Sequence, residues 1–390
     1  MVPKDAVQTC ILSKQWRNLW TFIPSLNFDK FRFKCTDAAF VHFVTNMLYF
    51  HGASKLDAFR LRWYTDQHLI TCIYREEMCQ IHVSNVSSWI FSALSCKPRS
   101  ISLVLRGFAN LKLPLALFTC TSLEQLDLQF IDSSKKDIHP KFINLPNLKK
   151  LKFFKCALHN LVMQGILSGC PLLEELNLHD CSLEFSEMKS DLLRRLSIIK
   201  CQGNGVVDIF MPSLISLHLE DHCPGITKLS LKNTPSLVKV FVSYDFFDEN
   251  YISGAEFELF NCLTTVTDLK LHGPGLEELL EKVILNCPKF DCLKQLTFGH
   301  EGAIIKKPVL LCQLLRHTPN LQKLTISQKQ PATSGEPKKM GATGQIPFRC
   351  DHLKAIEIKY SDPSGVQELV DVLLQNVSHD KGVRIDFSRF

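Results

Sequence analysis

Large apolar residues recur along this chain in the spacing L-x-x-L-x-L. In one clear copy, Leu173, Leu176 and Leu178 are the apolar positions, and Asn177 and His179 alternate with the last two. In a short strand, Leu176 and Leu178 would point to one side of a sheet and their polar neighbours to the other. Related copies begin at Leu123, Leu148, Leu193, Leu214, Leu237, Val266, Leu293, Leu321 and Leu353. The pattern predicts a series of short strands, each with one buried and one free face.

The first copies follow one another at intervals of about 20 to 25 residues, a spacing typical of leucine-rich repeats. A single unit of this size cannot bury its apolar face alone, so the units must stack. The predicted fold class is therefore α/β, a leucine-rich-repeat solenoid. We expect a horseshoe with a parallel sheet on the concave face and helices or turns outside.

Cysteine occupies the eighth position after the first leucine in successive repeats, at Cys156, Cys181 and Cys201, and His222 takes this position in the next. Leucine-rich repeats often place a small buried residue here. The chain has no C-x-x-C pair that could supply closely spaced metal ligands. It also lacks G-x-S-x-G, H-E-x-x-H and Walker motifs. We therefore predict no metal, no cofactor and no enzymatic activity.

The 390 residues carry a net charge of +6. The densest basic group is Lys149, Lys150, Lys152 and Lys155, which indicates either a solvated face or contact with an acidic patch on a partner. The excess is not clustered as a nucleic-acid interface would require. The sequence contains neither an apolar run long enough to span a bilayer nor the apolar core of a signal peptide. We expect a protein of the cytoplasm or nucleus, with its 16 cysteines reduced and with no membrane or nucleic-acid partner.

Lys4 to Asp29 is predicted to form two short helices and an exit loop, with an aromatic stripe of Trp16, Leu19 and Trp20. The run Ala6-Val7-Gln8-Thr9-Cys10-Ile11-Leu12-Ser13-Lys14-Gln15-Trp16-Arg17-Asn18-Leu19-Trp20, followed by Ile23-Pro24-Ser25-Leu26-Asn27-Phe28-Asp29, resembles the second half of a plant F-box. The first F-box helix, which begins Leu-Pro in that family, is not found before this run. The resemblance is therefore to a truncated F-box.

The resemblance to plant F-box/leucine-rich-repeat proteins of the FBD-like, RNI-like type implies a partner. Their F-box docks on a Skp-type adaptor and so joins a cullin-RING ubiquitin ligase. Carried over to this chain, the adaptor-binding residues would be Val7, Ile11, Leu12, Trp16, Leu19 and Trp20. With a partial F-box we expect weakened adaptor binding. The alternative is that Trp16 and Trp20 only pack this segment onto the repeats.

The rest of the chain divides around the repeats. Apolar spacing predicts helices at 37–50 and around 83–93 and strands at 56–63 and 100–105, which resemble the region after the F-box in the same proteins. Outer helices are expected at 158–169 and 276–284, and a surface loop at 328–347. A strand at 350–360, a helix at 364–377 and a strand at 383–387 resemble their FBD region. We therefore divide the chain into a partial F-box (1–30), an opening cap (31–110), repeats (111–345) and an FBD-like cap (346–390).

The repeat register also names the residues of the concave face. We predict that these bind a target protein: Lys150, Lys152, Phe154, Glu175, Asn177, His179, Arg195, Ser197, His218 and Glu220. Charges of both signs with a few apolar points suit a specific protein partner. The first hypothesis is a substrate-recognition subunit of a Skp-cullin-F-box type ubiquitin ligase. The second is a leucine-rich-repeat scaffold or decoy that cannot dock the adaptor.

Overall fold

A computed structural model describes residues 19–51, 55–65, 75–108, 110–132, 134–203, 205–220, 226–243, 255–300, 307–328, 352–361, 370–371, 373 and 383–389. Two compact units divide the chain, unit 1 up to Phe185 and unit 2 from Ser186. Each unit is described separately below. Among the described residues, none of the helices combines the length and apolarity needed to cross a bilayer.

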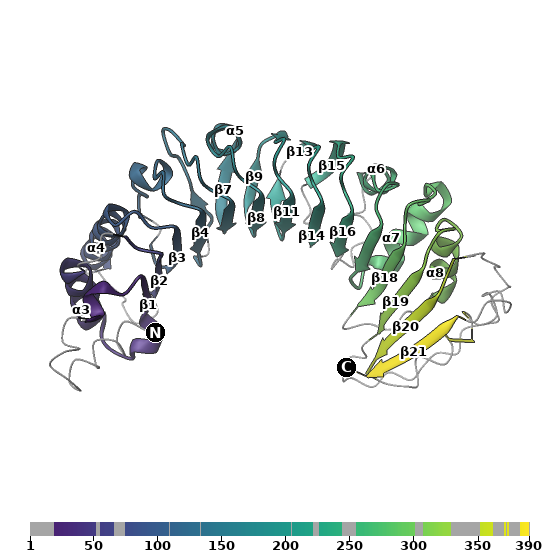
Figure 1. Cartoon of the computed structure of the whole chain (residues 1–390), viewed down its shortest axis with the longest axis horizontal. Coiled ribbons are helices and arrows are strands. Elements are labelled where there is room, and N and C mark those ends of the chain that lie inside the picture. The colour runs from purple at the N-terminus through teal and green to yellow at the C-terminus, as the bar shows by residue number, and fades with distance from the viewer. Residues whose placement is uncertain are drawn as a thin grey trace. The chain divides into compact units, whose positions relative to one another are not determined.

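Unit 1 is built on a parallel sheet with helices along one side (Figure 1). Its strands pair in the order β1 (Ser25–Asp29), β2 (Ala58–Tyr64), β3 (Ser100–Arg106), β4 (Gln125–Phe130), β6 (Lys150–Phe154) and β8 (Glu175–His179). The helices are η3 (Leu19–Phe22), α2 (Lys30–Phe33), α3 (Asp37–Phe50), α4 (Arg75–Ser95), η5 (Leu115–Phe118) and α5 (Asn160–Gly169). A second sheet of short strands contains β5 (Lys136–Asp137), β7 (Cys156–His159) and β9 (Ser182–Glu184), paired in that order.

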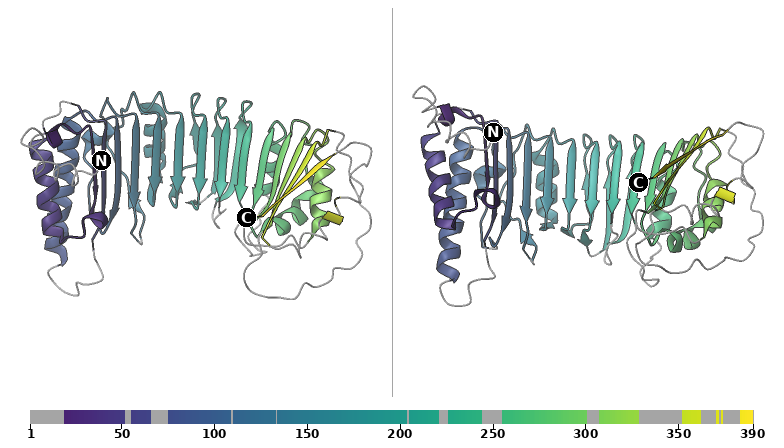
Figure 2. Two further views of the ribbon diagram at one scale, coloured as in Figure 1. Left: turned by 60° about the horizontal axis from the view of Figure 1, so that its bottom comes forward. Right: turned by 90° about the horizontal axis from the view of Figure 1, so that it is seen from below.

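Unit 2 continues the same local architecture. Its large sheet has the order β11 (Arg195–Ile199), β14 (Ser216–Glu220), β16 (Lys239–Ser243), β17 (Asp268–His272), β18 (Gln295–His300), β19 (Lys323–Gln328), β20 (Ala355–Tyr360) and β21 (Arg384–Arg389). The second layer has β10 (Glu187–Lys189), β13 (Gly205–Phe210) and β15 (Ile226–Asn233), paired in that order. The two-residue strand β12 (Gln202–Gly203) lies between β10 and β13 in the sequence and is not part of this sheet. The helices are α6 (Ala255–Cys262), α7 (Leu276–Val283), η6 (Ile284–Asn286) and α8 (Pro308–Leu315). Figure 2 shows the strands of each unit side by side, with β21 in yellow beside β20.

The repeat register places the predicted leucines in the core. Leu176 and Leu178 are fully buried, whereas Asn177 and His179 of the same strand are half-buried. Strands β6 and β8 pair Leu151 with Leu176 and Phe153 with Leu178, so the apolar positions form continuous rows. A row of buried side chains from adjacent strands is what stabilises a solenoid, since no repeat has a core of its own. The predicted leucine-rich-repeat fold is confirmed.

Each strand of three consecutive repeats ends in a residue with left-handed backbone, followed by a buried cysteine. Lys155, Asp180 and Lys200 have φ values of 55°, 51° and 51°. The following residues, Cys156, Cys181 and Cys201, are at most 1% exposed. The left-handed residue turns the chain out of the strand, and the small thiol fills the space beneath the turn. The prediction that these cysteines line the core is confirmed.

The opening cap is held together by aromatic packing. Trp63 on β2 is fully buried and lies 5.5 Å from Trp89 on α4 and 5.4 Å from Phe40 on α3, between ring centroids. The Trp89 indole donates a hydrogen bond to the Thr45 hydroxyl, 3.0 Å away, and so joins the two helices. The predicted helix at 37–50 is confirmed, and the helix and strands predicted around it also form.

Two local expectations were wrong. The exit loop at 25–29 is strand β1, whose Leu26 and Phe28 are buried and which pairs with β2. Leu158, expected in an outer helix, belongs to β7, and Leu161, expected on its apolar face, is 83% exposed. The expected end of this helix at Gly169 is confirmed, since α5 runs from Asn160 to Gly169. The loop expected at 328–347 and most of the helix at 364–377 lie outside the described residues.

Candidate functional site

The free side of the large sheet, opposite the buried leucines, is the part of each unit that offers polar side chains in regular rows. We call it the open face. In unit 1 it comprises the outward side chains of β4, β6 and β8: Gln125, Asp127, Gln129, Lys150, Lys152, Phe154, Glu175, Asn177 and His179. Register brings Lys152 beside Asn177 and Phe154 beside His179. The parallel strands thus convert positions about 25 residues apart in sequence into neighbours.

The unit 1 face contains one ring pair and a set of fixed polar groups. The Phe154 and His179 rings meet edge to face, with centroids 4.7 Å apart. The Glu175 carboxylate lies 3.6 Å from the Lys150 ammonium and accepts a 2.9 Å hydrogen bond from the Asn177 amide. The Gln129 amide donates to both oxygens of Asp127, at 3.0 and 2.9 Å. These contacts hold the side chains in place before any partner arrives.

The unit 2 face is built on a longer aromatic row. Phe241 lies between two histidines, with centroid distances of 4.4 Å to His218 and 5.3 Å to His272. Nε2 of His218 is 3.2 Å from the Glu220 carboxylate. His218 and Phe241 are register partners on β14 and β16, and His272 on β17 lies two residues beyond Lys270, the register partner of Phe241. The result is a half-buried apolar strip within a polar surface.

The predicted target-binding residues all occupy this face. Lys150 and Arg195 are exposed, and Lys152, Phe154, Glu175, Asn177, His179, Ser197, His218 and Glu220 are half-buried. Their role in binding stays a prediction. The sequence analysis did not name Phe241 and His272, although both were within its reach: Phe241 stands four residues after the repeat leucine Leu237, the same offset as His218 after Leu214.

Only the end of the predicted adaptor-binding segment can be located. Val7, Ile11, Leu12 and Trp16 lie outside the described residues, as does the side chain of Leu19. Trp20 is half-buried, and its ring meets that of Phe50 at 6.4 Å in a perpendicular arrangement. A ring nitrogen of His51 lies 2.9 Å from the carbonyl oxygen of Ile23. The segment is therefore joined to the end of α3.

The buried cysteines do not have the environment of a nucleophile. Burial raises the pKa of Cys170 and Cys287 to about 12. Burial likewise raises the pKa of Cys156 well above its ordinary value. A thiol needs a lowered pKa to react as a thiolate at neutral pH. These residues serve packing.

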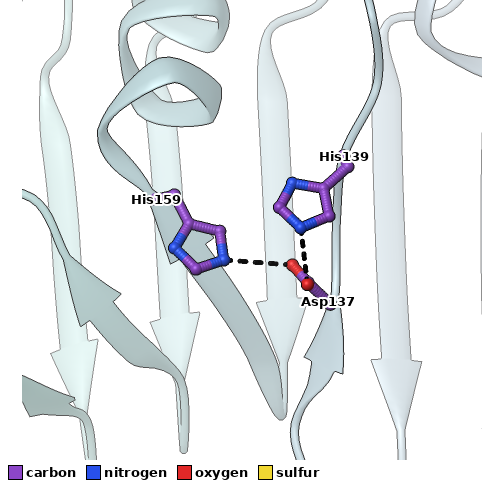
Figure 3. A group of neighbouring side chains, drawn as sticks. All are labelled: Asp137, His139 and His159. Carbon is purple, nitrogen blue, oxygen red and sulfur yellow. Dashed lines mark hydrogen bonds and ion pairs between the residues drawn. The ribbon is translucent and has the colours of Figure 1, made fainter.

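A second polar cluster lies in the short-stranded sheet of unit 1, and the sequence analysis missed it. It consists of Asp137 at the end of β5, His139 two residues later and His159 at the end of β7 (Figure 3). Their candidate ligand atoms lie within 4.8 Å of one another. The D-x-H spacing of 137–139 was visible in the sequence. No sequence motif linked Asp137 and His139 to His159, because His159 comes close to them only through the pairing of β5 with β7.

Repeated strand-turn units, a parallel sheet with one open face and buried cysteines at the turns define a leucine-rich-repeat protein. Residues 86–238 match the family model described as FBD-associated F-box protein At5g56370, LRR repeats. The chain is 30% identical over 337 residues to F-box/LRR-repeat protein At5g02910 of Arabidopsis thaliana, covering 83% of this chain and 67% of that protein. It is 26% identical over 401 residues to F-box/FBD/LRR-repeat protein At1g51370 of the same plant, covering 98% and 84%.

The chain therefore belongs to the F-box/LRR-repeat family, and its relatives include proteins with an FBD region. The resemblance in the sequence is confirmed. Coverage of the relatives varies: the chain spans 52% of the length of F-box/FBD/LRR-repeat protein At1g78750, with 29% identity over 254 residues.

Proposed function

We propose that this protein is a substrate-recognition subunit of a Skp-cullin-F-box type ubiquitin ligase and that its open face binds the target protein. The observation that carries the proposal is the presence of ordered aromatic rings on this face in both units, Phe154 with His179 and Phe241 with His218 and His272. Family membership supplies the ligase context. In this role the protein binds and positions its target, and the other subunits carry out the ubiquitin transfer.

The composition of the face favours a protein as the target. Protein interfaces concentrate binding energy in a few aromatic or arginine side chains surrounded by polar groups that exclude water. Phe154 and Phe241 are such anchors, and Lys150, Glu175 and Glu220 are the charged residues around them. Alternating charge would repel a uniform polyanion at some points and so disfavours nucleic acid. It suits a partner with its own pattern of charges.

Two observations support adaptor binding by the N-terminal segment. Its sequence resembles an F-box up to Trp20, and the Trp20 ring packs against Phe50 at the end of α3. In the proposed complex, Val7, Ile11, Leu12, Trp16 and Leu19 contact a Skp-type adaptor. Working in such a complex implies residence in the cytoplasm or nucleus.

Co-purification with a Skp-type adaptor tests the ligase part of the proposal. The tagged 390-residue chain should recover the adaptor, and Trp16→Ala should abolish recovery. Leu161→Ala is the matched control, because this apolar side chain is 83% exposed on the helical side and takes no part in the proposed contact. If the 390-residue chain recovers no adaptor, the scaffold hypothesis replaces the ligase hypothesis.

A photo-crosslinking residue tests the target-binding part. Placed at Lys152 on the open face it should yield a discrete crosslinked protein from cell extract, and Phe154→Ala in the same chain should remove this product. The same residue at Leu161 should not yield it. Phe154 is half-buried and outward-facing, so the alanine variant should keep its melting temperature. If the probe at Leu161 gave as much of the crosslinked product as the probe at Lys152, target binding by the open face would be refuted.

A further inference from the structure

Both ring nitrogens of His159 face carboxylates. Nε2 lies 3.2 Å from Oδ1 of Asp137, and Nδ1 lies 2.8 Å from Oε2 of Glu184. A neutral imidazole carries one N–H and can donate to only one of these groups, whereas a protonated imidazolium can donate to both. A neutral His159 ring can therefore bridge only one of the two carboxylates by its own N–H, which leaves the other nitrogen available as a ligand.

The other members of the cluster favour a metal ion between Nε2 and Asp137. Nε2 of His139 approaches Oδ2 of the same carboxylate at 2.5 Å, and the two imidazole rings stack in parallel at 5.0 Å (Figure 3). Two imidazole nitrogens and one carboxylate thus converge on one point. Glu184 meanwhile accepts from the far nitrogen of His159, as the carboxylate partners of metal-bound histidines usually do. Such a partner fixes the tautomer in which Nε2 is free to bind a metal.

We propose that Asp137, His139 and His159 form a binding site for a divalent zinc-type ion, with Glu184 as the orienting partner of His159. Two nitrogens and one oxygen are a ligand set typical of Zn²⁺, whereas Mg²⁺ and Ca²⁺ prefer oxygen ligands. Tetrahedral zinc holds its ligand atoms about 3.4 Å apart. The present limit of 4.8 Å can close to this by side-chain rotation, since Asp137 and His139 are both exposed. The carboxylates of Asp137 and Glu184 balance the charge of the ion.

Three protein ligands leave the fourth zinc position open. Asp137 and His139 also line a cavity of about 540 Å³, whose other walls include Leu111, Leu115, Phe118 and Lys136. The proposed site therefore borders a space lined by apolar and lysine side chains. A site of this kind can bind water or a donor atom of a further ligand in addition to fastening β5 to β7.

Zinc titration of the purified 390-residue chain tests the site. After chelator treatment and dialysis, calorimetry should show one equivalent of Zn²⁺ bound, and Co²⁺ should give the visible absorption of a tetrahedral nitrogen–oxygen site. His139→Ala and His159→Ala should each weaken binding at least tenfold. Glu184→Gln should weaken it by roughly 10- to 100-fold, because second partners of metal-bound histidines contribute that much. Mg²⁺ should not compete.

His42→Gln is the matched control, since His42 is an exposed histidine on α3 whose recorded contact is with Asn46, 2.9 Å away. It should bind zinc like the parent chain. Circular dichroism at each step separates loss of the site from loss of the fold. Equal zinc binding by the His139 and His159 variants would assign the metal to other residues and overturn the proposal. Absence of binding, with His159 doubly protonated in NMR spectra, would show that a proton alone joins the cluster.

Discussion

Gly169 and Gly165 lie one turn apart on α5 and offer a matched test of how the repeats pack. A Cβ atom built on Gly169 would stand 2.2 Å from the carbonyl oxygen of Ile143 and 2.8 Å from its carbonyl carbon, both backbone atoms of the preceding repeat. A Cβ on Gly165 would meet the terminal Cδ1 of the Ile143 side chain at 3.3 Å. Backbone cannot move aside as a methyl group can. The two glycines should therefore respond very differently to the same substitution.

Alanine is favoured over glycine within a helix by up to about 1 kcal/mol. For Gly165→Ala we expect this gain to offset the small shift of Ile143, so that the free energy of unfolding is unchanged or rises slightly. For Gly169→Ala, forcing an atom into a packed contact costs about 1–3 kcal/mol, which exceeds the helical gain. Because the helical gain applies to both variants, they should differ by roughly 1–3 kcal/mol in urea denaturation.

A second measurement locates the effect. The Leu145 amide donates a 2.8 Å hydrogen bond to the Gly169 carbonyl, so displacing Ile143 should expose this amide. Hydrogen exchange at Leu145 should become faster in Gly169→Ala and stay unchanged in Gly165→Ala. Two variants of equal stability, or a Gly169 variant with unaltered protection at Leu145, would refute the argument that close backbone approach requires the glycine.

Two further substitutions test local features. Lys97→Gly should stabilise the chain by about 0.5–1 kcal/mol in urea denaturation. Lys97 has a φ of 51°, and the strain of left-handed backbone in a non-glycine residue outweighs the chain entropy that glycine adds to the unfolded state. Lys112→Gly, at an exposed lysine without positive φ, should not be stabilising, and an equal gain in that variant would argue against strain at Lys97. Burial lowers the pKa of His82, whose ring packs against Trp63. The neutral His82 side chain therefore contributes its full stability above about pH 6.5, and this contribution falls at lower pH because the unfolded chain takes up a proton there first. His82→Leu should therefore lose less stability than the parent between pH 7.5 and 5.5 in thermal melts, and equal losses would exclude His82 as the cause.

The repeat core was predictable because strand alternation and the interval between repeats are local properties. Once Leu173 was aligned with Leu148 and Leu193, the burial of Leu176 and Leu178 and the exposure of their neighbours followed from the period of the strand. The buried cysteines followed from the same register. For the same reason, the individual residues of the open face could be predicted for the repeats up to Glu220.

The failures came from contacts between repeats. Strand β1 is short, follows Pro24 and resembles the end of the F-box pattern, so only its pairing with β2 distinguishes it from a loop. The short strands β5, β7 and β9 have too few residues to show alternation. Gly169 carries a packing constraint set by Ile143, more than twenty residues earlier. A single repeat contains none of this information.

The cluster around His159 shows why such contacts matter for function as well as for packing. In a solenoid, each repeat adds a strand at a constant register, so a side chain at one position acquires neighbours from the repeats before and after it. Asp137, His159 and Glu184 come from three successive strands of the same small sheet. His159 pairs directly with Glu184, whereas Asp137 pairs with Ala157 and reaches His159 two positions further along β7. Phe154 and His179 meet on the open face by the same rule. Sites in this protein should therefore be sought across neighbouring strands, because a motif within one repeat, such as Asp137 and His139, supplies only part of the cluster.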